Sequence, residues 1–138
     1  MLKISLEYWN ELANQLLLIS SLLSGFSIVV VANLLIYKSN NRLIVYILKA
    51  ATITVGCYLA TIFSMVKIIM MTTKGYPFEV TESDLSLPRL IGFLTFFFGI
   101  ISLSAVISLA GWTKSRSTGI FTTIVGFLTF VAIIIMLV

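Results

Sequence analysis

The segment LANQLLLISSLLSGFSIVVVANLLIY, residues Leu12–Tyr37, decides the fold of this protein. It runs for 26 residues without a charge, and Glu11 and Lys38 bound it. At a rise of about 1.5 Å per residue, a helix of this length reaches about 39 Å, more than the roughly 30 Å hydrocarbon core of a bilayer. We therefore expect a membrane-spanning helix with room to tilt.

The rest of the chain repeats this character. The sequence is 59% hydrophobic and 10% charged, whereas soluble domains carry about 25% charged residues. We therefore predict an all-α, polytopic membrane protein: a single domain of four transmembrane helices in a compact bundle, with an amphipathic lead-in over Met1–Glu11. The predicted spans are residues 12–37, 43–73, 90–112 and 118–138.

Charge and termini indicate the setting. The net charge is +4, but the basic residues cluster at the span ends, which favours contact with anionic lipid headgroups rather than with nucleic acid. Their counts slightly favour the first and third loops inside and both termini outside, and near-equal counts also permit dual insertion. The first eleven residues lack the pattern of a signal peptide. We expect a multi-pass protein of the cell membrane, as in a bacterial inner membrane.

Small residues at helical spacing predict the faces on which the helices pack, since lipid gives no hydrophobic drive for helix association. The candidate packing residues are Gly56, Ala60 and Ser64 in the second span, Gly92 and Gly99 in the third, and Gly119 and Gly126 in the fourth.

One sizeable polar segment separates the second and third spans, over residues 72–89. It contains the acidic residues Glu79, Glu82 and Asp84, and Pro88 fits the first turn of the following helix. Two interpretations are open: a solvated loop, or a contact for a protein partner over residues 74–89.

The sequence lacks the residues that several kinds of chemistry require. No carboxylate lies within a span, which argues against a proton-coupled exporter. The chain has no histidine and one cysteine, Cys57, so we expect no metal site of nitrogen and sulfur ligands and no cofactor. A Ser–Lys dyad would need Lys49 or Lys67 to be buried and neutral, whereas both fit positions near the interfaces. We expect no enzyme.

The first span carries an unusual polar pattern. Its N-terminal half has a polar line (Asn10, Asn14, Ser21, Ser24 and Gly25), followed by the apolar Ile28, Val29 and Val31 and then by Asn33. Around a symmetry axis, these positions would form a polar mouth, an apolar constriction and a ring of amides. Alternatively, the small residues pack against the other spans and the asparagines form local hydrogen bonds.

The run LLSGFS, Leu22–Ser27, resembles the first, pore-lining helix of the Orai family of calcium channels. The resemblance implies four spans and a ring of subunits with the first helix innermost. Gly25 and Phe26 match the family motif, and Val29 falls in its apolar stretch. Asn33 stands where the family has its selectivity glutamate, so the charge for calcium selectivity is missing. The family's basic segment before the helix is also missing, and its termini are cytoplasmic.

Two functions follow as hypotheses. The first is a homo-oligomeric, channel-like pore for small ions, lined by the first helix. The second is a non-conducting membrane interaction protein, such as an accessory subunit or a toxin-immunity factor, that acts through the 74–89 segment.

Overall fold

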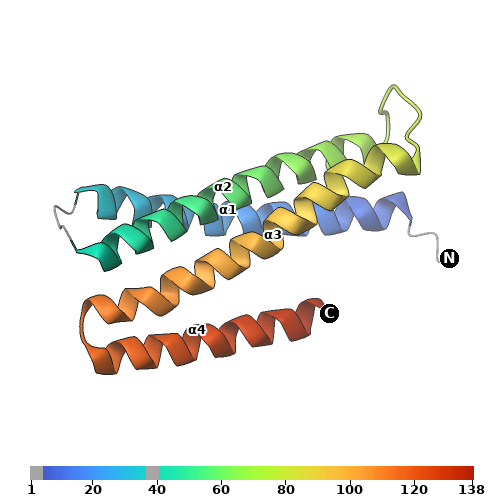
Figure 1. Ribbon diagram of the computed structural model, residues 1–138. Coiled ribbons are helices and arrows are strands. Elements are labelled where there is room, and N and C mark those ends of the chain that lie inside the picture. Colours follow the sequence, from blue (N-terminus) through green and yellow to red (C-terminus); the bar gives the residue numbers. More distant parts are fainter. Residues whose placement is uncertain (1–4, 37–40) are drawn as a thin grey trace.

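The computed structural model describes residues 5–36 and 41–138, and these residues form four long α-helices (Figure 1). In chain order they are α1 (Leu6–Ile36), α2 (Arg42–Thr72), α3 (Glu82–Ala110) and α4 (Arg116–Leu137), with a short 3-10 helix, η1 (Gly111–Thr113), before α4. All four are long and apolar enough to cross a membrane, and the described residues include no strand. The predicted all-α bundle of four helices is confirmed.

Each of the four helices begins before its predicted span. α1 has 31 residues, or about 46 Å, and it runs without a break from the amphipathic lead-in into the apolar segment. Its first turn is capped by Ser5, whose Oγ accepts a hydrogen bond from the Tyr8 N–H at 3.2 Å. Tyr37, the last residue of the first predicted span, lies outside the described residues.

The third helix begins earlier than expected, which corrects the prediction of a loop through residue 89. The cause is a capping arrangement at Thr81, whose N–H donates to the Asp84 carboxylate at 3.0 Å and whose hydroxyl donates to it at 2.7 Å. Glu82 and Asp84 therefore lie in the first turn of α3, where negative charge is favoured. Pro88 is the seventh helical residue rather than part of the first turn.

α2 is the central helix, packed against both α1 and α3, whereas α4 packs mainly on α3 and η1. Figure 1 shows α3 crossing the α1–α2 pair obliquely, with α4 running back beside it. Because successive helices alternate in direction, the start of α1, the end of α4 and the 73–81 loop lie toward one end of the molecule (Figure 1). The opposite end carries the basic residues Arg42, Lys114 and Arg116.

The buried core lies where α2 meets its neighbours. Its largest fully buried side chains are Tyr58, Met65 and Ile68, and Phe96 of α3 meets Tyr58 edge to face at 6.1 Å. Interhelical hydrogen bonds reinforce this contact, because the hydroxyls of Thr61 and Thr95 lie 2.8 Å apart between α2 and α3. Small hydroxyl residues thus join the helices, as expected inside a bilayer.

The predicted packing face of α2 needs correction at Gly56. This glycine is exposed, and a Cβ added to it would meet nothing within 4 Å. Ala60 and Ser64 are half-buried at the margin of the contact with α3, and the side that α2 buries carries larger residues. The reason is electrostatic: Gly56 shares its helix side with Lys49 and Lys67, both exposed, whose ammonium groups must reach water.

The glycines of α3 and α4 lie in close interhelical contacts. Gly92 faces Met65 and Ser64, and Gly99 lies against the Tyr58 ring, from which an added Cβ would stand 3.0 Å. Gly119 faces the Trp112 ring, and Gly126 faces Ser108, with an added Cβ 2.5 Å from the serine Oγ. α3 therefore supplies the small residues against which the bulky side chains of α2 pack.

Candidate functional site

α1 has one side that no other helix of the described chain covers. Its residues are all exposed, and we call this side the outward α1 face: Glu7, Glu11, Asn14, Ser21, Gly25, Ile28, Val29 and Asn33. Val29 is 57% exposed, and a Cβ added at Gly25 would meet nothing within 4 Å. The structure thus brings five of the six candidate pore residues onto one free side of the helix.

Ser24 is the exception, and its assignment to the same wall is corrected. It is 3% exposed and lies on the opposite side of α1, with Ser20 and Ser27. Because successive residues are about 100° apart around a helix, Ser24 and its neighbour Gly25 face different surroundings. The hypothesis that the small residues only pack against other helices therefore holds for Ser24 and not for Gly25.

The polar side chains of the outward α1 face differ in their hydrogen bonding. Asn14 donates to the Asn10 backbone oxygen at 2.9 Å and to its Oδ1 at 3.0 Å, and the Ser21 hydroxyl donates to the Leu17 oxygen at 2.7 Å. Asn33 makes no hydrogen bond with any residue that the structure describes. Its amide is therefore available to a group outside the described chain.

Behind this face, the helix contacts contain a set of buried hydroxyls. The Oγ atoms of Ser20 and Ser24 and the hydroxyl of Tyr58 are buried and have no hydrogen-bond partner among the described residues. Thr54 and Thr61, also buried on α2, instead donate to carbonyls of their own helix at 2.9 Å. These groups are neutral and cannot by themselves transfer protons as carboxylates do.

Replacing Tyr58 with phenylalanine tests this assignment. Since the hydroxyl has no partner, the Tyr58→Phe variant should be as stable as the wild type or up to about 1–2 kcal/mol more stable. Tyr58→Ala, which empties the same site, should lose about 3–5 kcal/mol. Unfolding in detergent micelles, followed by circular dichroism, measures both. A clear loss of stability in the phenylalanine variant would reveal a missing hydrogen-bond partner, such as a buried water.

The three acidic candidates of the 74–89 segment lie in different settings. All are exposed, but only Glu79 remains in the loop, while Glu82 and Asp84 belong to α3. The Asp84 carboxylate is occupied by Thr81, so its first role is to start the helix. In the same loop, the rings of Tyr76 and Phe78 meet edge to face with their centres 5.7 Å apart, and Phe78 is 71% exposed.

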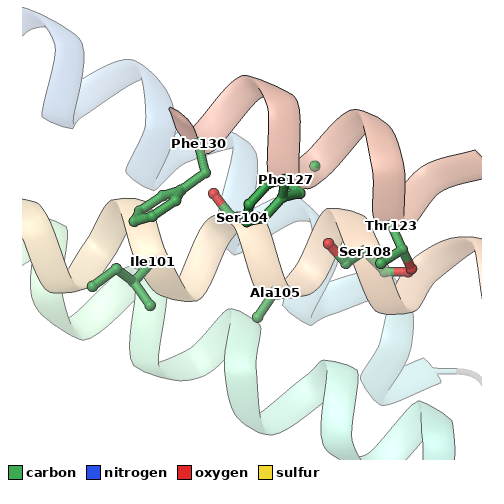
Figure 2. A pocket seen from close by; sticks show the side chains of 8 residues that line it. Ile101, Ser104, Ala105, Ser108, Thr123, Phe127 and Phe130 are labelled. Carbon is green, nitrogen blue, oxygen red and sulfur yellow. The ribbon is translucent and has the colours of Figure 1, made fainter. Parts of the chain in front are cut away.

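A groove of about 210 Å³ runs between α3 and α4. Figure 2 shows Phe127 and Phe130 of α4 lining it together with Ile101, Ser104 and Ser108 of α3. None of its lining residues carries a charge, so the groove offers an apolar surface with a few hydroxyls.

Metal-binding clusters are also missing from the described ranges, where no three residues of the types His, Cys, Asp and Glu come together. Comparison of the chain with protein-family models, with curated proteins and with solved structures finds no match. The protein is a small integral membrane protein with four apolar helices.

Proposed function

We propose that this protein forms a homo-oligomeric, channel-like pore for small ions, with the outward α1 face lining the path. The observation that carries the proposal is the free surface around Gly25, where a small residue and the neighbouring Ser21 stand in the middle of an apolar helix and touch no other helix of the subunit. A lipid-facing surface needs neither residue. A second copy, packed closely or across a narrow path, would use both.

The order of residues along the face supports a path with distinct zones. Glu7 and Glu11 stand at its start, and in a ring of subunits they would form a negatively charged mouth that attracts cations. Ile28 and Val29 would follow Gly25 as an apolar constriction, which can gate by excluding water. Asn33 would complete the path with uncharged amides whose oxygens replace part of an ion's hydration shell.

The resemblance of Leu22–Ser27 to the Orai family supports the same arrangement, with the first helix innermost in a ring. Asn33 gives the proposed pore a selectivity that differs from that of the Orai family. Without a carboxylate there, the ring holds no strong site for a divalent cation, so we propose a preference for monovalent cations, set mainly by Glu11.

Ion flux from liposomes tests the pore. Liposomes that contain the wild-type protein should release potassium faster than chloride. The Val29→Ser substitution should raise the rate of potassium release severalfold, because a hydroxyl group lets water into the constriction. Phe121→Ser, a larger apolar-to-hydroxyl change on the exposed side of α4, should leave the flux unchanged. Reconstituted protein and an ion-sensitive dye inside the liposomes give both rates.

A second candidate function is a non-conducting interaction protein. The observation in its favour is the 73–81 loop, where the exposed Phe78 and Glu79 present an aromatic and an acidic group together. The pore would be contradicted, and this second function favoured, if liposomes with the protein released potassium and chloride no faster than protein-free liposomes.

A further inference from the structure

Arg89 is a half-buried cation without an anionic partner. Its guanidinium lies 4.9 Å from the centre of the Trp9 ring, which joins the start of α3 to the start of α1. No carboxylate pairs with it among the residues that the structure describes. The carboxylate of Asp84, in the first turn of the same helix, is hydrogen-bonded to Thr81 instead.

The Trp9 contact fixes the guanidinium in place. Trp9 is itself held by Phe93, with ring centres 6.3 Å apart. Stacking on an aromatic face leaves the N–H groups at the edge of the guanidinium plane free to donate. Arginine with free edge donors matches a phosphate, which can accept two parallel hydrogen bonds.

An open depression of about 450 Å³ begins at the same arginine. Its polar end is formed by Ser86 and Arg89, and it continues along α3 over Leu90, Phe93, Leu94 and Phe97. From Arg89 to Phe97, eight residues later, the helix rises about 12 Å. The charge of Arg89 therefore lies at one end of the depression. From there an apolar surface extends along α3 in the direction expected for the bilayer interior.

We propose that this depression binds an anionic phospholipid, with the headgroup phosphate on Arg89 and one acyl chain along Leu90, Leu94 and Phe97. The charge selects the ligand: the lone cation is balanced by a lipid with net negative charge better than by a zwitterionic one, which carries its own ammonium. The site uses residues of α1 and α3 within one subunit, so it does not depend on the proposed pore.

Quenching of tryptophan fluorescence by brominated lipids tests the site. In the Trp112→Phe variant, Trp9 is the only tryptophan, and it reports on acyl chains that reach the depression. Brominated phosphatidylglycerol should quench Trp9 at a lower mole fraction than brominated phosphatidylcholine. Arg89→Gln should weaken this preference about tenfold, because it removes the donors to the phosphate.

The matched control is Arg116→Gln, since Arg116 is an exposed arginine at the start of α4 and its loss should leave the quenching of Trp9 unchanged. The wild-type preference should also shrink at 1 M salt, a measurement that needs no variant at residue 89. Equal quenching by the two lipids, or a preference that survives Arg89→Gln in a folded protein, would overturn the proposal.

Discussion

The Gly111→Ala substitution should destabilise the junction of α3 and α4 by about 1–3 kcal/mol, the range seen when a methyl group is forced into a packed site. A Cβ at this position would stand 2.6 Å from the Thr118 carbonyl oxygen and would also meet the Thr122 side chain. The first of these atoms belongs to the backbone of α4 and cannot rotate away. The whole start of α4 must therefore move.

This movement would disturb contacts that hold the two helices together. The Thr122 hydroxyl donates to the Ser108 carbonyl at 3.1 Å, and the Trp112 indole N–H donates to the Thr123 hydroxyl at 2.9 Å. On the opposite side of the junction, Gly119 lies against the Trp112 ring. Gly111 thus brings η1 against the backbone of α4, and Gly119 leaves room on α4 for the Trp112 ring.

Thermal unfolding of the purified protein in detergent, followed by circular dichroism, measures the effect. Gly56→Ala is the matched control, because it makes the same change on an exposed side of α2 where nothing lies within 4 Å. Its midpoint should stay at or above the wild-type value, since alanine favours a helix over glycine. Equal losses in the two variants would contradict the contact assigned to Gly111.

The contrast between Gly111 and Gly56 also separates what the sequence predicts from what it does not. The number and type of helices follow from uncharged apolar runs of sufficient length, which are local properties. The side that each helix buries is not local, because lipid and protein interior are both apolar and hydrophobic periodicity does not distinguish them. Gly56 was therefore predicted to pack, although Lys49 and Lys67 on the same side favour an outward position.

The residue at which α3 begins was not predicted from the sequence, for a different reason. Charged and hydroxyl residues around Glu82 are typical of a loop, and the same residues also cap a helix when Asp84 stands three positions after Thr81. The contact of Arg89 with Trp9 could not be predicted at all, because these residues are 80 positions apart and meet only through the packing of α1 and α3. The outward α1 face was largely predictable, since its residues recur at helical spacing.

Oxidation of a single-cysteine protein at Gly25 should link subunits to each other, whereas the same cysteine one position earlier should not. In a Cys57→Ser background, the thiol of Gly25→Cys would stand on the outward α1 face with nothing within 4 Å of its Cβ. If this face meets another copy, the Cα atoms of the two cysteines can come within the separation of about 4.4–6.8 Å that a disulfide requires.

Ser24→Cys supplies the matched control within the same turn. The substitution is close to isosteric, and the side chain is 3% exposed and directed away from the outward α1 face, so it should stay monomeric under the same oxidant. Denaturing gels without reductant, run on protein oxidised in liposomes, separate monomer from linked dimer. Most of the Gly25→Cys protein should run as dimer. Comparable linking at residues 24 and 25, or none at either, would contradict the symmetric contact through α1 on which the proposed pore depends.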